Sequence, residues 1–334
     1  KVMGGTSSIN AMSFVRGSPE DYDGWADLGC HGWDFESVLP YFKKSENFEG
    51  GGGKYRGVGG PLNVSPLRSP HPLSEVFLQA CANAGMKRVE DYNLPPQEGI
   101  GFVQGSIKRG WRFSAARAYL WPAKNRSNLT IHTGAHVQRV LFEGKKAVGV
   151  EYHHNGRTAR VNAMKAVIMS AGAFGSPQIL MLSGVGPADH LRNFEIPVVH
   201  DLAGVGKNFQ DHAGIEQSVR VDRPTYNVQT SPLDYLSFGL KWLISSTGPL
   251  SNPMAEVVGV LNSDTAENLS RVQYLFSPAG YKLSEQGPTF HKEPSVTGLT
   301  NLHRPYSKGW VGLNSINPLD PPLIQPNLFS DDRD

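Results

Sequence analysis

The sequence has little of what marks several common classes of protein. Its 334 residues include two cysteines, Cys30 and Cys81, which are too few for a disulfide framework or a cysteine-rich zinc site. No apolar run approaches the roughly 18 residues that a membrane-spanning helix needs. We therefore predict neither a disulfide-stabilised scaffold nor a transmembrane segment.

The chain also lacks a large excess of charge of either sign. The chain has 32 Lys and Arg against 30 Asp and Glu, a formal net charge of +2. So small an excess gives no support for nucleic acid or an anionic membrane as the main partner. Hydrophobic residues make up 39% of the chain and the mean hydropathy is -0.33, which is typical of a globular protein with a core.

Several catalytic and binding motifs are absent. The sequence contains no G-x-G-x-x-G, no G-x-S-x-G, no Walker loop and no H-E-x-x-H. The neighbours His153 and His154 would lie on opposite faces of a strand and could not share a metal ion. The sequence therefore predicts no metal site.

Hydrophobic periodicity divides the chain into two parts. Apolar residues on one face, Pro72 in the first turn and Gly85 at the end predict a helix over 72–84. The compact apolar run 166–172 predicts a buried strand, followed by a helix with Ser176 as its cap and Pro177 at its first position. Alternation predicts short strands at 129–133, 138–142, 147–152 and 158–162.

After about Gly214 the pattern changes to α+β. A helix is expected at 233–244, with strands at 256–261, 272–276, 297–302 and 310–314. We therefore expect an α/β region of nucleotide-binding type up to Gly214 and a mostly antiparallel domain after it.

Three segments combine glycine, small hydroxyl residues and an amide, and each has two interpretations. Residues 4–12 (GGTSSINAM) can bring the backbone close to a flat ligand, or can form a tight turn before a strand. Residues 170–177 (SAGAFGSP) can form a crevice for an anionic or nucleotide ligand, or can allow close packing of a strand and a helix. Residues 204–212 (GVGKNFQDH) include Asp211 and His212, which are either catalytic or structural.

Taken together, these segments resemble the glucose–methanol–choline (GMC) oxidoreductases, which oxidise alcohols with FAD. Residues 4–10, with Phe14, Gly17 and Asp23, are similar to the first signature of the family. Gly172-Ala173, with residues 176–180 and 183–186, is similar to the second. The likeness continues through Arg112-Phe113-Ser114, residues 205–212 and residues 321–327, and is greatest to the bacterial choline dehydrogenase and alcohol dehydrogenase branch.

The resemblance implies a partial FAD-binding (Rossmann-like) domain in 1–214, with interleaved lid and substrate segments, and a substrate-binding segment in 215–334. Glu256 matches a glutamate on the substrate side. Within the first signature, some choline oxidases of the family have a flavin-linking histidine where this chain has Ile9, which carries no nucleophile, so the resemblance implies non-covalent FAD. The residues expected at the cofactor are Val2, Gly4, Gly5, Thr6, Asn10, Ala11, Met12, Ser13, Val137, Ala171 and Gly172.

The family pattern also extends beyond this sequence at both ends. A βαβ unit with G-x-G-x-x-G is expected before Lys1, and the catalytic histidine after Asp334. We therefore nominate no catalytic residue, interpret His212 as structural, and expect the 334 residues alone to be inactive. The intact protein is expected to transfer hydride from a primary alcohol to flavin N5 and to pass electrons to a quinone, a carrier or oxygen.

Two alternatives to this reading are a truncated non-catalytic fragment and an FAD-containing lyase like the hydroxynitrile lyases. Bacterial members of the family are cytoplasmic or attached to the inner membrane, and the resemblance implies one of these locations.

Overall fold

The chain folds into two compact units, each made of separate stretches of sequence. The computed structural model describes residues 1–262, 271–284 and 286–334. The first unit contains 1–130 and 214–304, and the second contains 131–213 and 305–334. Gly214 begins the second stretch of the first unit, and each unit contains residues from both sides of Gly214.

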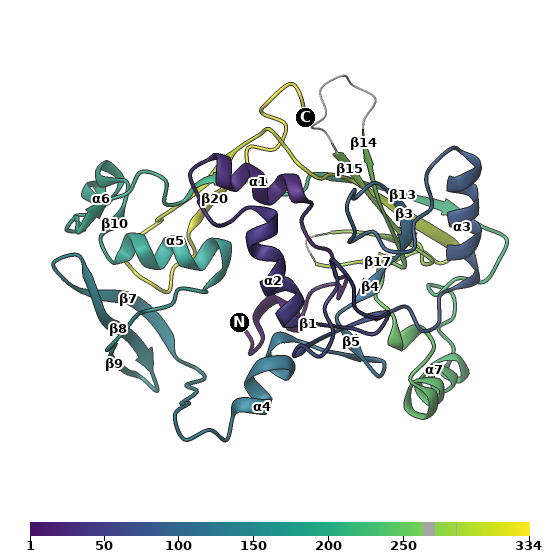
Figure 1. Cartoon of the computed structure of the whole chain (residues 1–334), viewed down its shortest axis with the longest axis horizontal. Helices are drawn as coiled ribbons and strands as arrows, with labels where there is room; N and C mark the ends of the chain where they lie inside the picture. The colour runs from purple at the N-terminus through teal and green to yellow at the C-terminus, as the bar shows by residue number, and fades with distance from the viewer. Residues whose placement is uncertain (263–270, 285) are drawn as a thin grey trace. The chain divides into compact units, whose positions relative to one another are not determined.

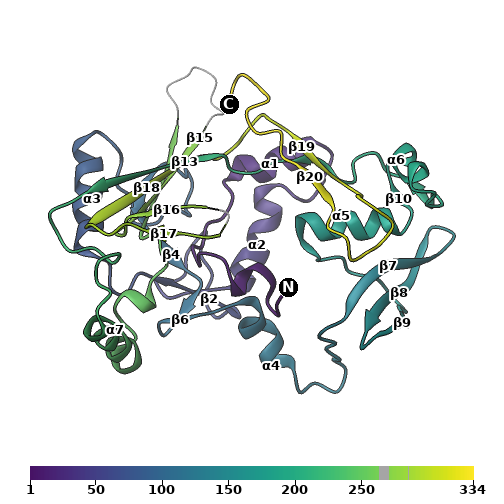
Figure 2. The same ribbon diagram turned by 180° about the vertical axis from the view of Figure 1, so that it is seen from behind.

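A five-stranded antiparallel sheet forms the centre of the first unit (Figures 1 and 2). Its strand order is β13-β18-β15-β14-β3. Strand β3 comes from the first half of the chain and pairs with β14, with Gly259 opposite Ile100. The strands are β3 (Gly99–Phe102), β13 (Gly214–Arg220), β14 (Val257–Asn262), β15 (Arg271–Ser277) and β18 (Ser295–Leu302).

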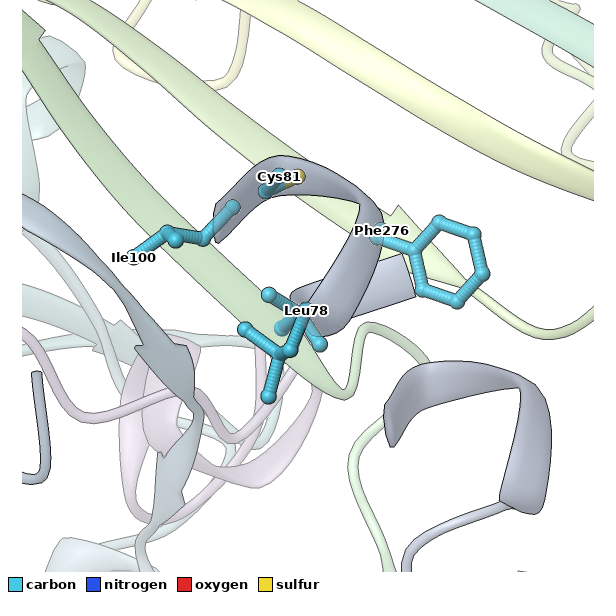
Figure 3. Close-up of a cluster of buried hydrophobic side chains, with 5 residues drawn as sticks. Leu78, Cys81, Ile100 and Phe276 are labelled. Carbon is cyan, nitrogen blue, oxygen red and sulfur yellow. The ribbon is translucent and has the colours of Figure 1, made fainter. Parts of the chain in front are cut away.

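Helix α3 (Pro72–Asn83) covers one face of this sheet. Leu78 and Cys81 of the helix pack against Ile100, Val257 and Phe276 of the strands, and all five are buried (Figure 3). The helix follows the expected pattern, because its apolar residues recur on one side and Pro72 occupies its first turn. This core holds the sheet in place, and the buried Glu256 lies directly before its strand β14.

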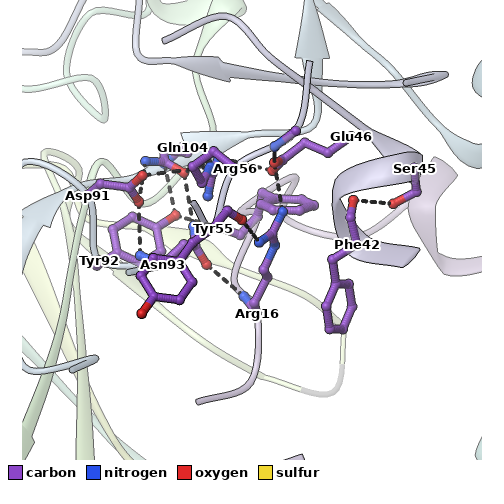
Figure 4. A network of polar contacts seen from close by, with 12 residues as sticks. Arg16, Phe42, Ser45, Glu46, Tyr55, Arg56, Asp91, Tyr92, Asn93 and Gln104 are labelled. Atoms are coloured by element: carbon purple, nitrogen blue, oxygen red, sulfur yellow. Dashed lines mark hydrogen bonds and ion pairs between the residues drawn. The ribbon is translucent and has the colours of Figure 1, made fainter. Parts of the chain in front are cut away.

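A buried polar network holds together the segment that follows the diglycine motif (Figure 4). The Glu46 carboxylate lies between two guanidinium groups, 2.7 Å from Nη2 of Arg16 and 3.1 Å from Nη2 of Arg56. Asp91 lies 3.7 Å from Nε of Arg56 and also accepts a hydrogen bond from Gln104. Burial lowers the pKa of Arg16, and the neighbouring Glu46 carboxylate opposes this effect.

Smaller elements surround the network and the sheet. The helices α1 and α2 begin at the side-chain caps Ser18 and Asp34. The remaining elements of the first unit are η1 (Gly5–Ser8), α1 (Pro19–Asp27), α2 (Phe35–Ser45), β1 (Glu46–Phe48), β2 (Leu62–Pro66), β4 (Gln104–Gly105), β5 (Ile107–Lys108), β6 (Trp111–Arg112), η2 (Ala116–Leu120), α4 (Trp121–Ala123), α7 (Pro232–Ser245), η3 (Pro249–Ser251), β16 (Tyr281–Lys282) and β17 (Thr289–Phe290).

The second unit contains two small antiparallel sheets, β7-β8-β9 and β12-β19-β20. Helix α5 contacts β7 and β19, and Figure 2 shows it beside β19 and β20. Met181, Leu191 and Leu313 form the buried core. The elements are β7 (His136–Glu143), β8 (Lys146–His154), β9 (Arg157–Asn162), α5 (Gly172–Leu182), β10 (Val185–Gly186), α6 (Ala188–Asn193), β11 (His200–Asp201), β12 (Lys207–Phe209), β19 (Gly309–Gly312) and β20 (Leu323–Gln325).

Two of the expected strands were wrong. Residues 129–133 and 166–171 are not strands, and Ile168 is 87% exposed. An apolar run becomes a strand only when a neighbouring strand pairs with its N–H and C=O groups, and no strand in the described part of the chain pairs with 166–171. The strands at 138–142, 147–152 and 158–162, and those of the antiparallel sheet, are confirmed.

The start of α5 was also predicted wrongly. The helix begins at Gly172, so Ser176 and Pro177 lie inside it. The Ser176 hydroxyl accepts a hydrogen bond from the N–H of Ala171 and so bonds to the chain before the helix. The small residues 172–175 form the first turn of the helix, whereas the Ser-Pro pair had suggested that the helix begins only after them.

The described residues offer neither a membrane span nor a cluster of metal ligands. None of the helices has both the length and the apolar character to cross a bilayer. Within 1–262, 271–284 and 286–334, no group of three or more His, Cys, Asp or Glu residues is arranged to hold a metal ion.

Candidate functional site

The diglycine motif forms a tight turn in the first unit. Gly4 and Gly5 have φ angles of +90° and +56°, and the 3-10 turn η1 follows directly. The hydroxyls of Ser7 and Ser8 donate to the backbone carbonyls of Gly4 and Met3. These two hydroxyls therefore stabilise the turn itself. The exposed backbone is the part of the turn that can contact a ligand.

Arg112 of β6 fixes the other end of this motif. The Asn10 side-chain oxygen accepts hydrogen bonds from Nη1 of Arg112 at 2.9 Å and from the N–H of Met12 at 3.0 Å. Arg112 also donates to the carbonyl of Ser7 at 3.2 Å. Burial lowers the pKa of Arg112. The sequence showed Arg112 only as part of a likeness to the family, so this positioning role was missed.

The other residues expected in this loop lie around the same turn. Met12 has a φ of +64°, and its carbonyl accepts from the N–H of Ser106. Ser13 forms a bridge with Gly105. Several side chains here are exposed, namely Val2, Thr6, Ile9, Asn10 and Ala11. The structure thus brings all the expected residues between Val2 and Ser13 into one partly exposed loop.

The second motif lies at the start of α5, in the second unit. Ala171 and Gly172 are exposed, and no side chain caps the N-terminus of the helix. Val137 also belongs to this unit and lies half-buried in β7, opposite Tyr152. These three expected residues are therefore grouped in one unit, and those between Val2 and Ser13 in the other.

The structure brings the second and third motifs together. A hollow of about 480 Å³ is lined by residues of α5, by residues 205–210 and by Val311. The rings of Phe174 and Phe209 lie 5.5 Å apart, and the N–H of Val311 donates to the carbonyl of Gly206 at 2.7 Å. Two segments that the sequence separates by about thirty positions thus form one wall, with the first turn of α5 at its edge.

Glu256 lies in the first unit and is fully buried. Its carboxylate accepts hydrogen bonds from the N–H of His71 at 2.6 Å and from the hydroxyl of Ser74 at 2.8 Å. It also accepts from the hydroxyl of Tyr226 at 3.0 Å and from the amide of Asn252 at 3.1 Å. The expected substrate-side glutamate is therefore surrounded by four donors of the protein.

A cavity of about 800 Å³ lies beside this carboxylate. His71 and Tyr226 line the cavity, together with Phe238 and Lys241 of α7, but Glu256 is not part of its wall. The rings of His71 and Tyr226 meet edge to face, with centroids 4.8 Å apart. Glu256 therefore acts on this cavity through the backbone of His71 and the phenol of Tyr226, which it holds by hydrogen bonds.

The lowered pKa of His71 predicts that the folded protein loses stability in acid. Burial lowers its pKa, against the opposing charge of Glu256, and its Nδ1 accepts from the N–H of Leu73 to cap α3. Because the unfolded chain binds the proton more readily, we expect stability to fall as the pH falls below about 6.5. Urea unfolding between pH 8 and 5 measures this.

The matched variant for this measurement is H71N, because asparagine also caps helices and does not titrate. We expect H71N to reduce the acid dependence and to keep most of the stability at pH 8. An unchanged pH dependence in H71N would show that the titration of His71 is not linked to folding.

Comparisons with known proteins agree with this geometry. The family model for GMC oxidoreductases matches residues 1–214. The mitochondrial choline dehydrogenase of Homo sapiens is 43% identical over 335 residues, covering all of this chain and 56% of that protein. The oxygen-dependent choline dehydrogenase of Brucella anthropi is 37% identical, covering all of this chain and 60% of that protein.

Solved structures show the same architecture. Formate oxidase matches with a TM-score of 0.89 at 25% identity, covering 99% of this chain and 64% of that one. Pyridoxine 4-oxidase from Mesorbium loti matches with a TM-score of 0.83 at 28% identity, covering 98% and 61%. The chain thus spans little more than half the length of the curated relatives, and about three fifths of these solved chains. Since the family model matches well over half of the chain and the expected motifs form the loops described above, the chain belongs to the GMC oxidoreductase family.

Proposed function

We propose that the intact protein is an FAD-dependent oxidoreductase that acts on the CH–OH group of a primary alcohol, either choline-like or aliphatic. The observation that carries this proposal is the similarity to choline dehydrogenases along the whole chain, at 36–43% identity. The proposal concerns the intact protein because the chain spans 56–60% of those relatives. It passes electrons to an acceptor that is a quinone, a carrier or oxygen.

The loops described above fit a flat flavin ring. A ring can approach backbone closely only where no Cβ intervenes. At Gly5 no heavy atom lies within 4 Å of the place where a Cβ would be, and the same is true of Gly172 at the start of α5. The uncapped N-terminus of α5, beside the hollow of about 480 Å³, suits the anionic part of the cofactor.

Asn10 and Arg112 would orient the ring. Since the Asn10 oxygen is occupied by Met12 and Arg112, its amide nitrogen is the group that can donate to a ring atom. The Arg112 guanidinium adds positive charge beside it, which stabilises negative charge on a bound ligand. When bound, FAD supplies the hydride acceptor at its N5 atom.

The residue types also bear on how FAD is held. Ile9 is 75% exposed and carries no nucleophile, which supports non-covalent binding. The chain contributes binding, orientation and part of the shielding from water.

Anaerobic flavin reduction tests the proposed function. The intact protein should be purified with FAD, and choline and a series of aliphatic alcohols should be added without oxygen. We expect at least one alcohol to bleach the visible absorbance of the flavin. Absence of bleaching together with cleavage of a cyanohydrin would instead identify a lyase, and absence of both would support a non-catalytic protein.

Gly5→Ala tests the flavin-facing turn separately from turnover. The Cβ would occupy the open space at this backbone, and we expect the affinity for FAD to fall at least tenfold. The left-handed φ costs about 1–2 kcal/mol of stability for a residue with a Cβ. Titration of the apoprotein with FAD, followed by flavin fluorescence, measures the affinity.

Gly144→Ala is the matched control for this variant. Gly144 has a φ of +58° and equally open surroundings, but it lies in the turn between β7 and β8. The same strain should appear there without a loss of FAD affinity. Equal affinities of the Gly5 variant and the parent protein would exclude this turn from the cofactor site.

A further inference from the structure

Helix α7 presents an apolar stripe that nothing in the described part of the chain covers. Five side chains spaced at i, i+3, i+7, i+10 and i+11 share one face of the helix. They are between 47% and 82% exposed and are Leu233, Leu236, Leu240, Leu243 and Ile244. A water-soluble helix usually has polar residues on its outer face, so this stripe requires an explanation.

The helix is anchored by its opposite face and its first turn. Nε1 of Trp242 donates to the carbonyl of Gly110 at 2.8 Å, and the rings of Trp242 and Trp111 lie 4.0 Å apart. At the N-terminus, Ser231 and Asp234 form a capping box. The exposed stripe is therefore a feature of a well-fixed helix, and the charge of Asp234 is used in the cap.

A basic hairpin lies against the C-terminal end of α7. Strands β5 and β6 pair through Lys108 and Trp111, and the exposed side chains at its tip are Lys108, Arg109 and Trp111. Between residues 99 and 130 the sequence has six Lys and Arg residues and no Asp or Glu. Lys241 adds a further exposed cation on α7 itself. Positive charge and a large indole ring thus border the stripe.

We propose that the stripe of α7 and the tip of the β5–β6 hairpin form a docking surface for an anionic lipid bilayer. The stripe would lie in the interface between headgroups and acyl chains, where helices of this kind bind through buried apolar area. The cations would face anionic headgroups, and Trp111 would lie at headgroup depth, which is the usual place of tryptophan.

The surrounding charge favours a bilayer over a second copy of the chain. A symmetric dimer through this face would bring the same patch of each copy together, and with it Lys108, Arg109 and Lys241 of both. Like charges at an interface oppose association. The inference goes beyond the proposed function and does not depend on the flavin.

Binding to vesicles tests the inference with the full chain. Large unilamellar vesicles of phosphatidylcholine, with and without one quarter phosphatidylglycerol, should be separated from free protein by flotation at 0.1 M salt. We expect tighter binding to the anionic vesicles. The variant L236Q/L243Q should reduce the partition coefficient at least tenfold, and K108Q/R109Q should reduce it about 25-fold on anionic vesicles only, since each cation contributes about fivefold.

Two control variants change exposed residues elsewhere in the same unit. L28Q/V58Q removes two exposed apolar side chains, and K44Q/K87Q removes two exposed cations. Both should bind as the parent does, and far-UV circular dichroism checks the fold of every variant. Failure of the parent to float would overturn the inference, as would stripe variants that bind equally or that only convert a dimer to a monomer.

Discussion

Replacing Glu46 with glutamine is expected to lower the free energy of unfolding by about 3–5 kcal/mol. The Glu46 carboxylate contacts Arg16 and Arg56 at 2.7 and 3.1 Å, and the two arginine side chains are only 4% and 5% exposed. Glutamine keeps the volume but removes the charge, which leaves two buried guanidinium groups with one remaining carboxylate, Asp91, at 3.7 Å from Arg56. Urea unfolding of the variant and the parent at pH 7, followed by circular dichroism, measures the difference.

Glu75→Gln is the control for this prediction. Glu75 also contacts an arginine, Arg88, through two hydrogen bonds, but both side chains are largely exposed. An ion pair in that position contributes about 0–1 kcal/mol. If the two variants lost equal stability, the buried network would contribute no more than a surface pair, and the expected role of Glu46 would be wrong.

Local pattern was enough to predict helices α3 and α7 and the strands β14, β15 and β18. Helix α3 has its apolar residues at helical spacing with proline at the start, and β14, β15 and β18 are runs rich in Val, Leu and Phe. The run 166–171 has the same apolar character and is not a strand, because strand formation also depends on a pairing partner. Periodicity carries no information about that partner.

The buried network could not be predicted for a related reason. Arg16, Glu46, Arg56 and Asp91 are far apart in the sequence and have the residue types of an ordinary surface. Only the tertiary fold shows that they share one interior site. The contact of Arg112 with Asn10 joins residues 102 positions apart, so the sequence showed Arg112 only as part of the family likeness and did not show what it contacts.

The sequence also left open how Glu256 acts. The likeness to the family suggested a place beside the substrate, where a carboxylate would attract a cationic group. In the structure its four contacts are uncharged donors from α3, from residues 226 and 252, and from the N–H of His71. The burial of Tyr226 raises its pKa, and the charge and hydrogen bond of Glu256 raise it further. The phenol therefore remains a donor to Glu256 over the range in which proteins are studied.

Glu256→Gln should therefore reduce the free energy of unfolding by about 3 kcal/mol or more, whatever the substrate is. An amide has one acceptor oxygen and one donor nitrogen, so two of the four donors would face an N–H group. Tyr226→Phe is the control, because it removes one hydrogen bond and should cost about 1 kcal/mol or slightly more. Urea unfolding of both variants measures these losses without requiring activity.

The same variant separates the two roles of Glu256. If the carboxylate mainly organises the wall of the cavity, Glu256→Gln loses stability, and the affinity of the intact enzyme for choline and for an uncharged alcohol falls equally. If it mainly contacts a cationic substrate, unfolding is unchanged and only the affinity for choline falls. We expect the first result, because the side chain is fully buried behind His71 and Tyr226, which are the residues that line the cavity.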